Sequence, residues 1–330
     1  MLDCFKKKLF VIFGKINKRK GENTLDKIVR KEADMHTHST HSDGRNDVSE
    51  LVWLVKKANL KAVMLTDHDR IGGLKEFIDS CANNGIDSMT GIEISSTDTT
   101  LHPQTIDVLG YGFNVEILLR DYNQLLEHNL NVRIKYIKEV LELFREREVA
   151  NFTLESLRAH FNLPVEISNK YWLIALRVNE LIISVKAPEA LEIARKELKK
   201  GGCFFVEREN YISTKEAINA IRRSGGIAIW AHPTKTIEKL KEKCENPKKI
   251  FSTILDRMVS EGLDGIEVCT PYGDNHRKFL LDCANQKKLI ITGGSDYHGE
   301  YGLIKDDYLG KGGVSYKEFL EIKKRISCFK

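Results

Sequence analysis

Eleven residues hold the strongest signal in this chain: Asp34-Met35-His36-Thr37-His38-Ser39-Thr40-His41-Ser42-Asp43-Gly44. His36 and His38 alternate at the period of a β-strand, so both imidazoles point to one face of an extended backbone. Asp43 follows in a Ser-Asp-Gly turn that can return its carboxylate to the same face. Two histidines alone do not close a metal site, and two surface histidines in a polar loop are the simpler interpretation. A metal site therefore requires further ligands from elsewhere in the chain.

The composition is that of a globular protein. The chain has 330 residues, of which 42% are hydrophobic and 30% are charged, so it is neither a disordered nor a membrane protein. Its seven cysteines show no Cys-x-x-Cys spacing, and no secretory signal precedes them. This pattern favours reduced thiols and a cytoplasmic location.

The basic character of the chain is confined to its N-terminus. Residues 1–33 carry ten basic and four acidic side chains, whereas the rest of the chain carries 42 basic and 43 acidic ones. The apolar run at 9–13 is too short to span a bilayer. We therefore expect a basic N-terminal extension over residues 1–32. It either contacts an anionic membrane or nucleic acid, or forms an extra helix with a solvated lysine face.

Strand and helix patterns alternate on both sides of a long helical region. Before it, the patterns predict helices at 48–60 and 74–82 and strands at 62–66, 89–94 and 106–110. After it, they predict helices at 213–223, 250–260 and 274–286 and strands at 227–230, 265–268 and 289–292. Such alternation is typical of an α/β barrel or a doubly wound sheet.

The helical region between the two halves reads as an insertion. A long amphipathic helix is predicted over 121–148, followed by helices at 154–160, 172–183 and 188–200. We therefore predict a core domain in two parts, 33–114 and 213–330, with a helical cap inserted at 115–212.

Metal-ligand residue types recur at or near the ends of the predicted core strands. They are His36, His38, His68, Glu93, Asp107, His232, Asp296 and His298. Each residue alone is weak evidence, because a histidine or aspartate at a strand end is commonly an ordinary loop residue. A buried ring of such groups, however, would be costly unless cations or partners neutralised it.

The motifs in this order resemble those of the polymerase and histidinol phosphatase (PHP) superfamily. They read Asp-x-His-x-His-Ser-x-x-Ser-Asp-Gly, Thr-Asp-His-Asp, Gly-Ile-Glu-Ile-Ser, Ala-His-Pro and Gly-Ser-Asp-Tyr-His, and they span about residues 33 to 300. The chain looks most similar to the stand-alone nucleotide phosphoesterases of that superfamily. The resemblance implies a distorted (β/α)7 TIM-like barrel with an inserted helical cap and two or three divalent metal ions.

The resemblance also implies a set of ligands for each ion. His36, His38, Glu93 and Asp296 would hold the first ion, Glu93 and His232 the second, and Asp43, His68 and His298 the third. The family has a histidine where this chain has Asp107, so either Asp107 or His102 would complete the second site. Mixed imidazole and carboxylate ligands suit Mn²⁺, Fe²⁺ or Zn²⁺.

The implied activity is hydrolysis of phosphomonoesters, of nucleotide or short-RNA-end type, by a metal-bridged hydroxide. Glu93, Asp296 and His232 would be the catalytic groups, and the partner would be a small phosphorylated substrate. Alternatives are a histidinol-phosphatase-like activity and a metal-binding PHP domain without catalysis.

For several charged residues near these motifs the sequence leaves two roles open. Arg133 matches a family position that contacts phosphate, or it extends along the apolar stripe of its helix. Lys170 or Arg177 would have to replace a second arginine that the family commonly has. Asp67 and Asp69 either orient His68 or face water.

Overall fold

The computed structural model describes residues 31–101, 104–164, 170–181, 184–271, 274–299 and 308–327. Its strands are β1 (Ala33–Thr37), β2 (Ala62–Leu65), β3 (Gly91–Asp98), β4 (Gln104–Tyr111), β5 (Ile227–Trp230), β6 (Gly265–Glu267) and β7 (Ile290–Thr292). Its helices are α2 (Val48–Lys57), α3 (Leu74–Asn83), α4 (Val115–Glu146), α5 (Leu154–Phe161), α6 (Lys170–Leu181), α7 (Ala187–Glu197), α8 (Thr214–Arg223), α9 (Pro233–Lys241), α10 (Pro247–Ser260), α11 (Arg277–Lys287) and α12 (Tyr316–Ser327). The N-terminal extension predicted over 1–32 lies almost wholly outside the described residues.

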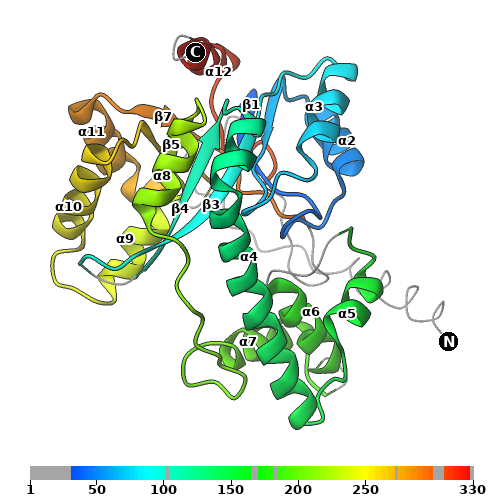
Figure 1. Cartoon of the computed structure of the whole chain (residues 1–330). Coiled ribbons are helices and arrows are strands. Elements are labelled where there is room, and N and C mark those ends of the chain that lie inside the picture. The colour runs from blue at the N-terminus through cyan, green and yellow to red at the C-terminus, as the bar shows by residue number, and fades with distance from the viewer. Residues whose placement is uncertain are drawn as a thin grey trace, which may run out of the picture.

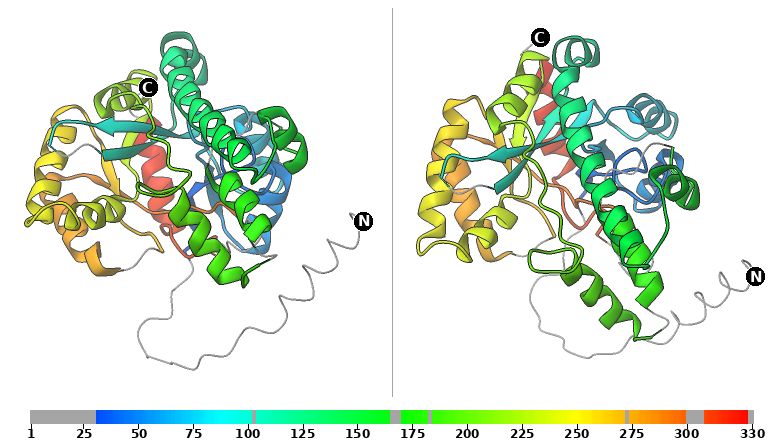
Figure 2. Two further views of the ribbon diagram at one scale, coloured as in Figure 1. Left: turned by 90° about the horizontal axis from the view of Figure 1, so that it is seen from below. Right: turned by 60° about the horizontal axis from the view of Figure 1, so that its bottom comes forward.

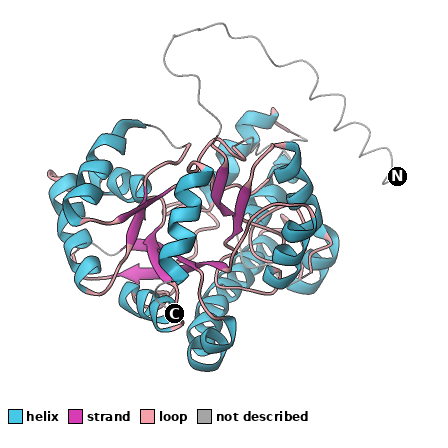
Figure 3. Cartoon of the chain, turned by 90° about the horizontal axis from the view of Figure 1, so that it is seen from above, coloured by secondary structure: helices cyan, strands magenta, loops and turns pink. Residues whose placement is uncertain are grey.

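The strands form two sheets at the centre of the molecule, with helices around them (Figure 3). β1 and β2 pair in parallel, and the second sheet has the order β3-β4-β5-β6-β7. Within the second sheet β4 runs antiparallel to both neighbours, whereas β5, β6 and β7 are parallel. The predicted mixed α/β class is confirmed, and the closed barrel stays a prediction.

Backbone hydrogen bonds join the two sheets just beyond the paired strands. The N–H of Asp69 donates to the carbonyl of Glu93, and the N–H of Glu93 donates to the carbonyl of Asp67. On the other side, the N–H of His38 donates to the carbonyl of Tyr297. The segments that follow β2 and β7 are therefore fixed against β3 and β1.

Local sequence explains where the core elements begin and end. The four residues of β5, Ile-Ala-Ile-Trp, are all buried, as expected for a strand covered on both faces. A capping box of Ser213 and Glu216 starts α8, and one of Asp47 and Glu50 starts α2. Two helices, α9 and α12, were not among the predicted elements.

The region after β4 is helical, as predicted. The long helix α4 extends away from the sheets, and α5, α6 and α7 lie beside its far half (Figures 1 and 2). These helices enclose a separate apolar cluster that includes Phe144, Leu157 and Trp172. The guanidinium of Arg45 lies 5.4 Å from the ring centroid of Trp172, so the cluster adjoins the loop that carries Asp43. The boundaries of the cap as a domain stay a prediction.

Asn129 fixes α4 to the core. Its amide nitrogen donates to Oδ1 of Asp69 at 2.7 Å and to the carbonyl of Ser95 at 2.6 Å, and its amide oxygen accepts from the N–H of Ile212 at 3.0 Å. Asn129 is fully buried, so these three bonds satisfy a polar group that would otherwise be costly to bury.

Among the described helices, none is both long and apolar enough to span a bilayer.

Candidate metal centre

The structure brings together ligand types from both halves of the chain. The first half contributes residues of β1, β3 and β4 and the loops after β1 and β2, and the second half contributes the loops after β5 and β7. All nine residues predicted as metal ligands meet there: His36, His38, Asp43, His68, Glu93, Asp107, His232, Asp296 and His298. Eight of them, all but His232, form three overlapping groups that could each hold an ion, the third group being His68, Glu93 and Asp107. Nε2 of His232 lies beside Glu93 and Asp107.

The most deeply buried group consists of His36, His38, Glu93 and Asp296. Nε2 of His36 lies 3.1 Å from Oε2 of Glu93 and 3.3 Å from Oδ1 of Asp296. Nε2 of His38 lies 3.3 Å from the same two oxygens. Two imidazoles and two carboxylates thus converge on one point.

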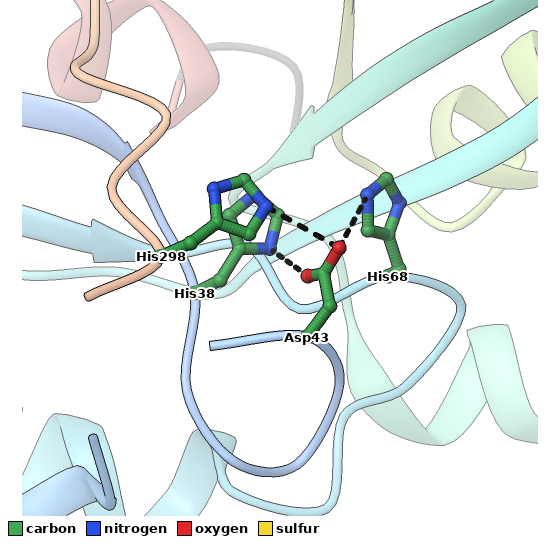
Figure 4. Close-up of side chains that lie close together, drawn as sticks. All are labelled: His38, Asp43, His68 and His298. Carbon is green, nitrogen blue, oxygen red and sulfur yellow. Dashed lines mark ion pairs between the residues drawn. The ribbon is translucent and has the colours of Figure 1, made fainter. Parts of the chain in front are cut away.

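Asp43 is the centre of a second group (Figure 4). Its Oδ1 lies 3.3 Å from Nδ1 of His38. Its Oδ2 lies 3.3 Å from Nε2 of His298 and 3.6 Å from Nε2 of His68. The Ser-Asp-Gly turn therefore returns the carboxylate to the face that carries His38, as the sequence predicts.

Glu93 and Asp107 lie near a further pair of histidines. Oε1 of Glu93 lies 3.1 Å from Nε2 of His232, and Oε2 lies 3.3 Å from Nε2 of His68. Oδ2 of Asp107 lies 3.7 Å from Nε2 of His232, while its Oδ1 accepts the hydroxyl of Ser95 at 2.7 Å. His102, the alternative to Asp107, lies outside the described residues.

Two charged residues that touch these ligands were not predicted. Glu267, at the end of β6, places Oε1 3.1 Å from Nδ1 of His36 and accepts the backbone N–H of His232 through Oε2 at 2.8 Å. Lys235, in the first turn of α9, places Nζ 2.6 Å from Oδ2 of Asp296. The sequence held one signal for each residue. Glu267 is an acidic residue at the end of an apolar strand, and Lys235 is a lysine three residues after His232.

Asp67 and Asp69 are both buried, so neither faces water. Asp67 accepts the N–H and hydroxyl of Ser39 and the hydroxyl of Ser42, which fixes the loop after β1. Asp69 accepts the N–H of Ser95 at 3.0 Å and also binds α4. These hydrogen bonds of both carboxylates hold chain segments around the site.

The predicted phosphate-binding residues lie in different surroundings. Arg133 donates from Nε to Asp69 at 3.0 Å and from Nη2 to Ser95 Oγ at 2.6 Å, and its side chain is only 9% exposed. Arg177 pairs with Glu197 inside the helical region, at 2.7 and 3.0 Å. Lys170 begins α6, and its side chain is not described. Roles for all three in phosphate binding stay predictions.

The charges in the site stabilise one another. Burial opposes ionisation of Glu93, but attraction to His68 and His36 holds its pKa well below the ordinary value. Burial likewise opposes charge on His38, but attraction to Asp43 and the nearby carboxylates of Asp296 and Glu93 raises its pKa to about 10. Protonated imidazoles therefore neutralise the buried carboxylates when no other cation does so.

The donor set fits divalent metal ions. Both ring nitrogens of His38 are buried and lack a hydrogen-bond partner, although carboxylate oxygens lie nearby. Buried polar atoms of this kind are normally satisfied, and coordination to a cation would satisfy them. Mixed nitrogen and oxygen donors suit Mn²⁺, Fe²⁺ and Zn²⁺.

Comparison with known proteins agrees with this geometry. The model of the PHP domain matches residues 34–196. A 5'-3' exoribonuclease from Haemophilus influenzae is 28% identical over 85% of this chain and 94% of its own length. A 3',5'-nucleoside bisphosphate phosphatase from Chromobacterium violaceum is 26% identical over 82% of this chain and 88% of its own length.

A solved structure gives the same result for the fold. It belongs to a protein from Bifidobacterium adolescentis that is described as a metal-dependent phosphoesterase. It superimposes with a TM-score of 0.72 at 22% identity, over 89% of this chain and 96% of the other. Residues 34–196, which carry the first half of the candidate metal centre, thus match the PHP domain family, and the relatives and the shared fold extend the similarity over most of the chain.

Proposed function

We propose that this chain is a metal-dependent hydrolase of phosphate esters whose substrate carries a phosphomonoester on a nucleotide or at the end of a short RNA. The observation that carries the proposal is the convergence of eight imidazole and carboxylate side chains in three overlapping groups, with His232 beside the third. Two relatives support the substrate class, because one is named for exonuclease action on RNA and the other for a nucleoside bisphosphate.

We propose one ion for each group, with His232 in place of His68 at the third. His36, His38, Glu93 and Asp296 would hold the first ion, and Asp43, His68 and His298 would hold another. Glu93, Asp107 and His232 would hold the remaining ion, so that Glu93 is shared. The chemistry supplied by such ions when bound is activation of water and neutralisation of charge on the phosphate oxygens.

The chain's own residues prepare the site for that chemistry. The carboxylates of Glu93 and Asp296 are at most 3% exposed, so their ligand oxygens are shielded from bulk water. Glu267 directs Nε2 of His36 into the site by bonding the opposite ring nitrogen. We propose Glu93, Asp296 and His232 as the groups closest to the reacting phosphate.

We also propose that the strands close into a distorted seven-stranded barrel. Backbone bonds from His38 to Tyr297 and from Asp69 to Glu93 support closure, because they join the two sheets at both edges. A cytoplasmic location is proposed as well, supported by the free thiols of Cys81, Cys203, Cys244, Cys269 and Cys283.

A phosphate-release assay tests the proposed activity. Purified protein, stripped of metal and reloaded with Mn²⁺, Fe²⁺ or Zn²⁺, is given nucleoside monophosphates, nucleoside bisphosphates, short 5'-phosphorylated RNA and histidinol phosphate. We expect release from the nucleotide or RNA substrates, with H36A and D296N at least about 100-fold slower. D256N is a suitable control, because Asp256 is an exposed carboxylate paired with Lys287.

Two outcomes would contradict the proposal. If the protein hydrolyses histidinol phosphate and none of the nucleotide or RNA substrates, its activity is that of a histidinol phosphatase. A loaded protein that binds metal and hydrolyses none of these esters would favour a PHP domain without catalysis.

A further inference from the structure

Lys235 lies at the edge of the most buried ligand group. Its ammonium is 2.6 Å from Oδ2 of Asp296, while Oδ1 of the same carboxylate is 3.3 Å from Nε2 of both His36 and His38. One carboxylate therefore separates the ammonium from two predicted metal ligands. The Lys235 side chain is 40% exposed, whereas Asp296 is only 3% exposed, so the ammonium is on the solvent side of the cluster.

The backbone of α9 fixes where this lysine can reach. The helix starts at Pro233, directly after His232, and the N–H of Lys235 donates to the carbonyl of His232 at 2.9 Å. Since His232 itself lies 3.1 Å from Glu93, the first turn of α9 is tied to the metal centre. Lys235 is thus held beside the cluster by its own helix as well as by Asp296.

The two described arginines that were predicted to bind phosphate each contact a carboxylate other than Asp296. Arg133 donates to Asp69 and to Ser95, and its side chain is 9% exposed. Arg177 forms a two-point pair with Glu197. Lys235 combines partial exposure with direct contact to a predicted ligand of the metal centre.

We propose that Lys235 binds the phosphate group of the substrate at the metal centre. The inference rests on the proposed function and assigns a substrate-binding residue within the same site. An ammonium carries three rotatable donors, so it can bond a carboxylate and a phosphate oxygen together. Its positive charge stabilises a dianionic phosphate that lies against the metal ligands. Lys235 is a point charge, so it recognises phosphate without demanding one fixed orientation of the ester.

Binding of inorganic phosphate to the Mn²⁺-loaded protein tests the proposal directly. The variants are K235M, which keeps the length of the side chain without its charge, and the conservative K235R. K241M is the matched control, because Lys241 lies on the same helix, is 45% exposed and pairs with Glu238. Calorimetry gives the phosphate affinity, and elemental analysis gives the metal content of each protein.

We expect K235M to bind phosphate about 10- to 100-fold more weakly, the range of one charge-assisted hydrogen bond. Its metal content stays at the wild-type value, K235R recovers part of the affinity, and K241M equals the wild type. With a phosphomonoester substrate, K235M raises KM by a similar factor. Unchanged phosphate affinity in K235M would overturn the proposal.

Loss of metal together with phosphate affinity would also overturn it, since Lys235 would then act only by positioning Asp296. Failure of the proposed function is a separate result. It would appear as a wild-type protein that hydrolyses no phosphate ester, whatever the variants of Lys235 bind.

Discussion

Oε1 of Glu267 lies 3.1 Å from Nδ1 of His36, and Oε2 of the same carboxylate accepts the backbone N–H of His232 at 2.8 Å. One buried side chain thus contacts two predicted ligands that are far apart in sequence. His232 has a φ of 32°, a left-handed conformation that non-glycine residues adopt only when neighbours hold them there. Glu267 is therefore a positioning residue for both histidines.

Replacing Glu267 by alanine should weaken metal binding about 10- to 100-fold, the usual effect of losing a group that orients a ligand histidine. E267Q keeps an acceptor oxygen and should lie between E267A and the wild type. Titration of the metal-free protein with Mn²⁺ measures the affinity. Equal affinities of E267A and wild type would show that His36 and His232 keep their positions without this carboxylate.

The metal-free protein should lose stability as the pH rises above neutrality. The pKa of His38 is raised from 6.5 to about 10, because attraction to Asp43 and neighbouring carboxylates outweighs its burial. A raised folded-state pKa contributes stability that is complete below pH 6.5 and is lost as the pH approaches 10. The pKa of His36 is raised in the same direction despite its burial, by Glu93 and Glu267.

Melting temperatures of the chelated protein between pH 7 and pH 10 check this expectation. The metal-loaded protein should decline less, because bound cations replace the protons that neutralise the carboxylates. A chelated protein whose melting temperature is flat across this range would argue that these histidines are uncharged in the folded state.

Gly294 packs directly against His36. A Cβ atom at this position would lie 2.2 Å from Cβ of His36 and 2.6 Å from its backbone nitrogen. G294A should therefore displace β1, cost about 1–3 kcal/mol of stability and lower the metal content. Denaturant unfolding and elemental analysis measure the two effects. In G85A, where a Cβ meets nothing within 4 Å, the metal content should remain normal despite the positive φ of 67°.

Removing the side chain of Asn129 should loosen α4. N129A leaves the N–H of Ile212 and the carbonyl of Ser95 without this partner inside the protein, at a cost of about 1–3 kcal/mol for each buried group. Hydrogen exchange should rise in α4 and around residue 212. The matched control is N123A on the same helix, because the side chain of Asn123 donates to the exposed carboxylate of Glu127 at 2.7 Å. Equal exchange in the two variants would refute an anchoring role.

Much of the core could be predicted because its strands are short apolar runs that end in polar residues. β5 was predicted with both of its ends, since Gly225-Gly226 precede it and Ala231-His232-Pro233 follow it. α9 was missed because Ile237 and Leu240 are the only apolar residues in it that follow Pro233. Its helical pattern is therefore faint, although Pro233 at its first position is a known start signal.

The side-chain partners of the site were harder to predict than its ligands. Motifs name ligands by residue type and spacing, but Glu267 and Lys235 act through contacts between segments 231 and 61 residues apart. Strand direction was also hidden, because alternation of side chains is the same in parallel and antiparallel pairs. The antiparallel course of β4 was therefore visible only in the structure.

The antiparallel pairing of β3 and β4 limits which changes in sequence the candidate metal centre can accept. Asp107 faces Ser95 across the β3–β4 hairpin and is flanked by the buried side chains of Ile106 and Val108. Because neighbouring side chains point to opposite faces, a slip of one residue would carry the carboxylate into the apolar core and bring a hydrocarbon side chain to the candidate metal centre. Evolution can therefore exchange the residue type at 107 far more easily than it can change the length of the hairpin by one residue.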